Sequence, residues 1–182
     1  MSSPVQSWQT AEIPGPKRAF VISKPDVVSA MIGKTGRVLV VVGSDAGKIK
    51  TKDGDLVDSM IRLSKTGKVQ LAATGHLAGE FVRRGFNEIR STPLFNLGDR
   101  LRDPAWKGLD GEGPYGLVIF VGFLYYYEWL VLSGLKHFAS HLRTISLGQF
   151  YQPHSSFSFL NSSSEEWTGY LDKIIHDLEV NV

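Results

Sequence analysis

The chain has 182 residues, of which 42% are hydrophobic and 21% charged, and its formal net charge is +2. This composition is that of an ordinary globular protein. Nucleic-acid binding requires clustered positive charge, and because the basic residues are mostly spread along the chain, we do not expect that function. The sequence has no cysteine, which excludes disulfides, thiolate zinc sites and cysteine-ligated iron–sulfur clusters. No basic segment followed by an apolar run opens the chain, so we expect no secretory signal and a cytoplasmic protein.

Residues 1–24 predict an extended arm that precedes a single domain over residues 25–182. Pro14 and Pro16 disfavour a helix in this arm. Trp8 lies there in a polar setting, where an exposed indole would be costly. We therefore expect the arm to pack across its own domain or onto a partner subunit.

The domain alternates apolar runs that end in glycine with segments of helical periodicity. The runs predict buried strands over residues 37–43, 68–75, 117–122 and 142–148, and a brief strand is expected around Ile89. Helical spacing predicts helices over residues 25–36, 56–67, 94–101 and 162–180. The last of these helices begins with a capping box formed by Ser163 and Glu166.

Residues 113–138 are the most apolar passage of the chain and raise the question of a membrane span. A membrane helix needs about 20 apolar residues without an unpaired charge. Gly122 and Glu128 interrupt the passage, and its first half repeats the pattern of the other strands. We therefore predict a strand followed by a helix from Tyr125, and no membrane span.

Strands that alternate with helices predict an α/β fold, a three-layer Rossmann-like parallel sheet of about six strands with helices on both faces. In such a sheet ligands bind beyond the carboxyl ends of the strands. Any site is expected at the edge marked by Gly43, Gly75, Gly122 and Gly148.

The turn after the first buried strand is a shortened version of a phosphate-binding loop. The stretch from Gly43 to Lys48 is one residue too short, and Ile49 replaces the hydroxyl that would bind magnesium. Triphosphate hydrolysis is therefore not expected. Gly43 and Ser44 could still bring backbone amides to a phosphate at the following helix. An ordinary strand-to-helix turn explains the same residues equally well.

Two further groups of polar and aromatic residues lie at the same edge. Thr74, Gly75 and His76 follow the second buried strand and could bind a phosphate or a ring, or simply begin a helix. Tyr125 opens a run of three tyrosines, of which one or two could face a flat cofactor or an interface. The aromatic loop over 148–159 fits interface packing or ligand stacking equally well. His137 and His141 have the spacing of a zinc motif but lack its glutamate, so no metal is expected.

Several of these stretches resemble the epsilon subunit of the archaeal acetyl-CoA decarbonylase/synthase complex. They are "AEIPGPK", "AMIGKTGRVLVVVG", "ATGH", "LVIFVGFLYYYEWLVLSGLKHF", "QFYQPH" and "EEWTGYLDKII". The strands are also similar to the DHS-like NAD/FAD-binding domain and the central domain of thiamine-diphosphate enzymes, as regards fold alone. The segment after Gly47 is longer and richer in lysine than the resemblance leads us to expect.

The resemblance implies a non-catalytic accessory subunit that binds the nickel–iron–sulfur alpha subunit in an α2ε2 carbon monoxide dehydrogenase component. It also implies a stabilising role there and help with electron transfer to FAD. Self-association is expected when the partner is missing, because the partner-facing apolar surface would otherwise face water. The alternatives are an independent flavin or nucleotide binder, which would use Gly43, Ser44, Thr74, Gly75, His76, Gly122 and Tyr125, and an enzyme of the same fold.

Overall fold

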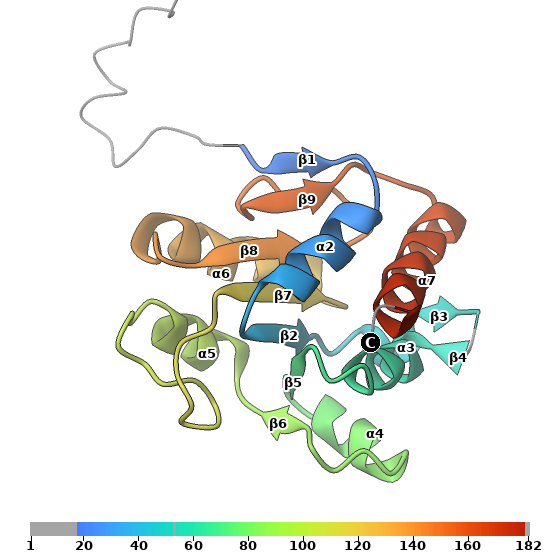
Figure 1. Ribbon diagram of the computed structural model, residues 1–182, viewed down its shortest axis with the longest axis horizontal. Helices are drawn as coiled ribbons and strands as arrows, with labels where there is room; N and C mark the ends of the chain where they lie inside the picture. The colour runs from blue at the N-terminus through green and yellow to red at the C-terminus, as the bar shows by residue number, and fades with distance from the viewer. Residues whose placement is uncertain (1–17, 53, 181–182) are drawn as a thin grey trace, which may run out of the picture.

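A seven-stranded sheet, in which every strand runs in the same direction, passes through the middle of the protein (Figure 1). The computed structural model describes residues 18–52 and 54–180. In spatial order the strands are β1 (Phe20–Ile22), β9 (Phe157–Phe159), β8 (Arg143–Ser146), β7 (Leu117–Val121), β2 (Val38–Val42), β5 (Gln70–Ala73) and β6 (Arg90–Ser91). The predicted parallel α/β fold is confirmed, while its similarity to the DHS-like domain stays a prediction.

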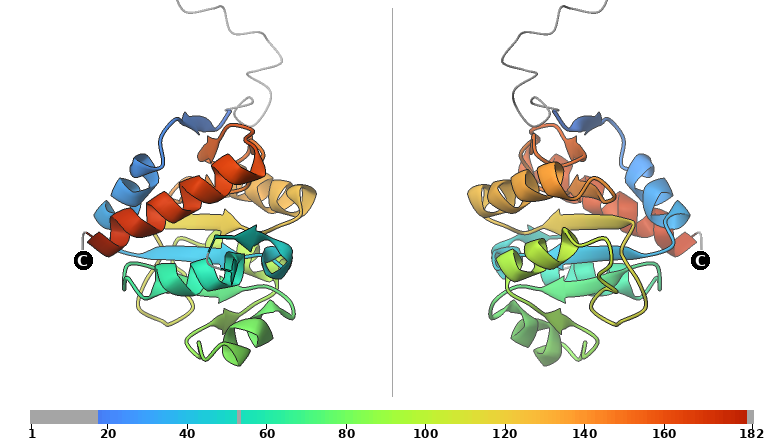
Figure 2. Two further views of the ribbon diagram at one scale, coloured as in Figure 1. Left: turned by 90° about the vertical axis from the view of Figure 1, so that its right-hand side faces the viewer. Right: turned by 90° about the vertical axis from the view of Figure 1, so that its left-hand side faces the viewer.

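Helices cover both faces of the sheet, as Figure 2 shows. One face carries α2 (Asp26–Lys34), α3 (Leu56–Ser64), α4 (Leu77–Arg83) and α7 (Ser164–Val180). The other face carries α5 (Leu94–Leu101) and α6 (Tyr125–Phe138). A short 3-10 turn, η1 (Ala46–Lys48), and a two-stranded hairpin of β3 (Lys50–Thr51) and β4 (Gly54–Asp55) separate β2 from α3.

The central strands are apolar throughout because they are buried on both faces. Every residue of β2 and of β7 is buried. In β2, Val40 and Val42 pack with α3 and α7, while Leu39 and Val41 pack with α5 and α6. Side chains of a strand alternate between its faces, so an unbroken apolar run is needed where both faces are covered.

The C-terminal helix begins as its sequence predicts. The backbone N–H of Ser163 donates to the Glu166 carboxylate at 3.0 Å, and the Glu166 N–H donates to the Ser163 hydroxyl at 3.2 Å. Trp167 and Leu171 are buried beneath the helix, and Tyr170 stacks on Phe159 with ring centroids 5.1 Å apart. The predicted capping box and apolar face are therefore confirmed.

The apolar passage over 113–138 divides into strand β7 and helix α6, as expected. Gly122, with φ of +73°, makes the turn between them. In the described part of the chain, no helix has the length and apolar character needed to cross a bilayer. The helix expected after residue 94 is α5, and the strand expected around Ile89 is β6, one residue further along.

The sheet contains two strands that the sequence did not predict. β1 lies in the segment assigned to the arm, and β9 lies in the segment assigned to an aromatic loop. Each has three residues, too few for a periodic pattern, and they form by pairing with each other in parallel. β1 therefore belongs to the sheet of the domain. The predicted packing of the arm and of Trp8 lies outside the described residues, and the boundary at residue 24 stays a prediction.

Candidate functional site

The glycines predicted at the carboxyl edge of the sheet include two that lie against each other. Gly43 follows β2 and Gly122 follows β7, and these strands are hydrogen-bonded neighbours. A Cβ atom on Gly43 would stand 2.4 Å from the Gly122 carbonyl oxygen and 2.5 Å from the Phe123 ring. The N–H of Gly43 already donates to the Val121 carbonyl at 2.8 Å. Close packing of two turns therefore accounts for both glycines.

The second predicted group follows β5 at the same edge. Thr74 is buried, and its hydroxyl donates to the Val42 carbonyl of β2 at 3.3 Å. Gly75 has φ of +60° and is exposed, as is His76 at the start of α4. The structure therefore brings Thr74 close to the end of β2, while His76 faces solvent at a helix terminus.

The turn that resembles a phosphate-binding loop does not lead directly into a helix. Ser44 is exposed, and η1 and the β3–β4 hairpin follow before α3 begins. The lysine-rich segment thus forms the hairpin, with the Lys48 and Lys52 side chains largely exposed. These observations favour the interpretation as an ordinary turn.

The N-terminus of α3 is occupied by a carboxylate of the chain itself. Asp55 Oδ1 accepts hydrogen bonds from the backbone N–H groups of Val57, at 3.0 Å, and Asp58, at 3.3 Å. Arg84 donates to both Asp55 oxygens at 2.6 and 2.7 Å, and this bidentate pair lowers the pKa of Asp55. The amides that a phosphate would use at this helix are therefore already satisfied.

The sequence predicted that the three tyrosines at the start of α6 point in different directions, but only Tyr125 points away from the other two. The Tyr125 hydroxyl donates to the Tyr151 carbonyl in the loop after β8, at 3.2 Å. The rings of Tyr126 and Tyr127 lie side by side, with centroids 4.2 Å apart. Tyr127 also meets the edge of Phe95 from α5 at 6.2 Å. Tyr125 therefore faces the loop, and its two neighbours face outward.

An exposed apolar surface extends over α5 and α6. Its five side chains, here named the aromatic surface, are exposed by 40 to 59%: Phe95, Tyr126, Tyr127, Leu130 and Phe138. A groove of about 160 Å³ between the two helices is lined by Phe95, Leu130 and Arg102, and the Arg102 guanidinium lies 5.9 Å from the Phe138 ring. The five side chains therefore form one connected patch, of the kind that marks a protein-binding surface.

A buried polar cluster lies on the opposite side of α6. Glu128 is only 4% exposed, and burial raises the pKa of its carboxyl to about 7, although a hydrogen bond from Ser146 acts in the other direction. Gln152 is fully buried beside the start of α6, where its Nε2 donates to the Tyr125 carbonyl at 3.4 Å. Within the described residues, Glu128 Oε1 and Gln152 Oε1 have no hydrogen-bond partner. In the sequence analysis Glu128 served only to exclude a membrane span. A single carboxylate within an apolar run also indicates a buried ionisable group, and that signal could have found this cluster.

The loop after β8 is held against α6 at several points. The Lys136 ammonium donates to the Pro153 carbonyl at 2.6 Å, and Trp129 meets the His154 ring edge-on at 4.7 Å. This loop covers the polar inner side of β8 and β9, where Thr144 and Ser158 are buried. It thereby holds α6, which carries most of the aromatic surface, from its second turn to its last.

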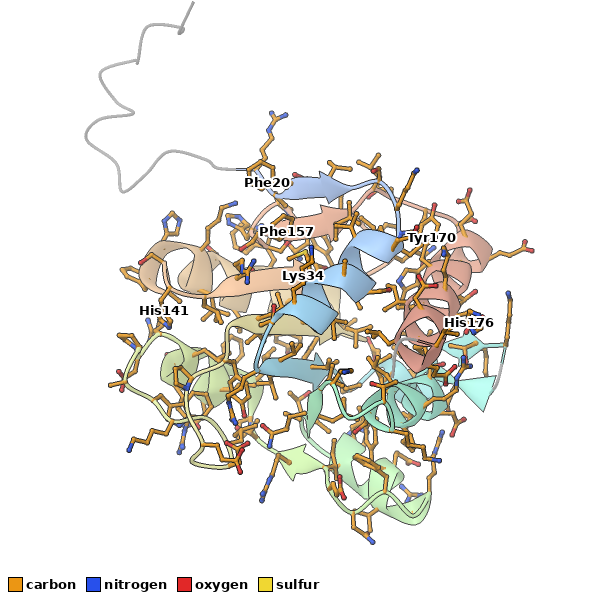
Figure 3. All side chains as sticks on the ribbon, in the orientation of Figure 1. Phe20, Lys34, His141, Phe157, Tyr170 and His176 are labelled. Carbon is orange, nitrogen blue, oxygen red and sulfur yellow. The ribbon has the colours of Figure 1, made fainter. Side chains whose placement is uncertain are left out.

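No metal site is found among residues 18–52 and 54–180, since no three His, Asp or Glu side chains there could hold an ion together. His137 and His141 lie at and just beyond the end of α6 (Figure 3). The polar groups at the carboxyl edge of the sheet mostly form hydrogen bonds within the protein. The aromatic surface, by contrast, has no partner within the described chain.

The fold and the aromatic surface together define a Rossmann-like α/β protein with an exposed apolar face. The family described as CO dehydrogenase beta subunit/acetyl-CoA synthase epsilon subunit matches residues 1–175. The chain belongs to this family.

Its relatives carry the name acetyl-CoA decarbonylase/synthase complex subunit epsilon. The protein of Methanothermobacter thermautotrophicus is 33% identical over 92% of each chain. The protein of Methanothrix soehngenii is 35% identical over 92% of this chain and 88% of its own. The epsilon 1 protein of Archaeoglobus fulgidus is 37% identical over 85% of this chain and 83% of its own. The resemblance noted in the sequence is thereby confirmed, and the relatives are subunits of a multi-subunit complex.

Proposed function

We propose that this chain is a non-catalytic subunit of an acetyl-CoA decarbonylase/synthase complex that binds and stabilises the nickel–iron–sulfur alpha subunit in an α2ε2 component. The observation that carries the proposal is the aromatic surface, because five large apolar side chains on one helix pair are costly to leave in water. Aromatic residues are also the type enriched at the centres of protein interfaces.

The chemistry of the chain supports a role without catalysis. A chain without cysteine cannot ligate an iron–sulfur cluster through thiolates, so the metals of such a component belong to the partner. The strongly shifted carboxyl, that of Glu128, lies beneath α6 with its two oxygens shielded from solvent. A carboxyl buried in this way is shielded from a substrate in solution, which supports a role without catalysis.

Mixing this chain with its alpha subunit tests the proposal. Size-exclusion chromatography with light scattering should show one complex, and Tyr127→Glu or Leu130→Glu should dissociate it, because each places a charge inside the interface. Val82→Glu is the matched control, since Val82 on α4 is 51% exposed and lies outside the aromatic surface. Independent elution of the wild-type proteins, or loss of binding in the control alone, would contradict the proposal.

Self-association of the isolated chain is part of the same proposal. When the partner is missing, the aromatic surface should meet that of another copy, because the apolar side chains would otherwise face water. Sedimentation of the isolated chain should therefore show an oligomer that Leu130→Glu shifts toward the monomer. Adding the alpha subunit should compete with this self-association.

We further propose that the subunit assists electron transfer to FAD in the assembled complex. The supporting feature is the carboxyl edge of a parallel sheet, where folds of this class bind ligands, with Gly43, Thr74 and Gly122 close together. Titrating FAD into the alpha–epsilon complex should quench tryptophan fluorescence, and Tyr125→Ala should weaken the quenching. An unchanged signal on FAD addition would remove this part of the proposal and leave the docking role intact.

A further inference from the structure

Strand β1 leaves one side of its backbone open. It stands at the end of the strand order and pairs with β9 (Figure 1). The N–H of Phe20 donates to the Ser156 carbonyl at 2.9 Å, on the β9 side. Because successive residues of a strand direct their N–H and C=O groups to opposite sides, those of Val21 point away from the sheet. No described strand pairs with that outer side.

The two edge strands of the sheet differ in the side chains that they expose. β6 has two residues, one of them the charged Arg90, and Pro93 follows it closely. Short length, charge and proline are the usual devices that prevent an edge strand from pairing with another chain. β1 instead exposes 72% of Phe20 and 49% of Val21. Phe20 lies over Phe157 of the neighbouring strand, with centroids 5.7 Å apart (Figure 3).

The charges around β1 indicate what kind of strand fits there. Arg18 precedes the strand and Lys24 follows it, and both are exposed. Asp26, two residues beyond Lys24, pairs with Lys173 at 2.8 Å and interacts with Lys24 only through a smaller coulombic contribution. A second copy that paired antiparallel about Val21 would place Arg18 opposite Lys24 at both ends. Like charges directly opposite each other destabilise strand pairing, whereas opposite charges stabilise it.

We propose that β1 is a docking edge for an extended segment of another protein, with an apolar centre and Asp or Glu residues on both sides. The segment adds to the sheet as a further strand and hydrogen-bonds to the backbone of Val21. Its carboxylates pair with Arg18 and Lys24, and its apolar side chains cover Phe20 and Val21. This edge is distinct from the aromatic surface, so the two interactions are independent.

A fluorescent peptide with a Val-Ile-Val centre and glutamates at both ends is the probe. Its anisotropy should rise on titration with the full chain and fall again with added salt, because the flanking ion pairs are exposed. The control peptide has lysines in place of the glutamates and should bind at least several-fold more weakly. Equal binding of the two peptides, or none by the glutamate peptide, would overturn the proposal.

Val21→Pro tests the backbone contact directly. Proline removes the outward N–H but leaves the hydrogen bonds of Phe20 and Ile22 to β9, and edge strands accept proline at such positions. Peptide affinity should fall roughly tenfold, the effect of a lost hydrogen bond. Val21→Thr, which retains the N–H, should keep most of the affinity. Equal affinities of the proline variant and the wild type would contradict the proposed pairing.

Charge reversal provides a second test in case the proline variant fails to fold. The double variant Arg18→Glu, Lys24→Glu should prefer the lysine peptide over the glutamate peptide. Tyr127→Glu should leave peptide binding unchanged, which separates this edge from the docking surface of the proposed function. A wild-type dimer that Val21→Pro dissociates would assign the edge to a second copy and overturn the proposal.

Discussion

Gly43 and Gly122 pack backbone against backbone at the carboxyl edge of the sheet, so that a Cβ on Gly43 would stand 2.4 Å from the Gly122 oxygen. The contact joins the turns that follow two neighbouring strands, β2 and β7. It explains why these strands both end in glycine without requiring a ligand between them.

Gly43→Ala should destabilise the protein by about 3 kcal/mol, because the added methyl group meets backbone atoms that cannot move aside. Urea unfolding followed by circular dichroism measures the change. Gly33→Ala in α2 is the control, since a Cβ there meets no atom within 4 Å. It should leave stability unchanged or raise it by up to about 1 kcal/mol. A tolerated Gly43→Ala would show that the turns can separate.

Asp55 both caps α3 and pairs with Arg84, and two substitutions separate these roles. Asparagine is an equally good N-cap, so Asp55→Asn should cost only the ion pair and the hydrogen bonds between the two side chains. Asp55→Ala also removes the cap, which adds about 1 kcal/mol. Chemical unfolding of both variants at neutral pH gives the two values. Equal costs would show that the cap contributes nothing.

The buried carboxyl of Glu128 should make stability depend on pH. Its pKa is about 7 in the folded protein and near 4.5 when exposed. The unfolded state therefore loses the proton first, and the folded state loses stability as pH rises from about 4.5 through 7. The difference of about 2.5 units corresponds to about 3 kcal/mol at pH 8.

Glu128→Gln removes this ionisation and tests the effect. Relative to the wild type, the variant should gain stability between pH 5 and pH 7 and level off above, measured by urea unfolding at each pH. Glu165→Gln, at the exposed start of α7, controls for the loss of one carboxylate. A difference between wild type and Glu128→Gln that does not change with pH would contradict the raised pKa.

Trp167 links α7 to the end of β8. Its indole Nε1 donates to the Leu147 carbonyl at 2.8 Å, and the ring is 4% exposed. Trp167→Phe should cost about 2–3 kcal/mol, because it leaves the carbonyl unpaired and opens a small cavity. Thermal unfolding measures the loss. Trp129→Phe, where the side chain is 38% exposed, should cost much less, and equal costs would contradict this account.

The candidate site shows where sequence reasoning reached its limit. The predicted glycines lie at the edge of the sheet as expected, because parallel strands end at a common edge. The hairpin over Lys50–Asp55 was not predicted, and it separates the turn after β2 from α3. The tyrosine run predicted aromatic contact, but the contribution of Phe95 from α5 depends on how two helices cross.

Periodicity by itself determined the central strands, the main helices and the capping box at Ser163, because each depends on residues a few positions apart. Only the tertiary structure decided that Phe20–Ile22 and Phe157–Phe159 form strands, since each is stabilised by a partner more than 130 positions away in the chain. It also decided that Glu128 is buried and Tyr127 exposed. Neighbouring residues on a helix point in different directions, and the packing of the whole sheet sets which of them meets the core.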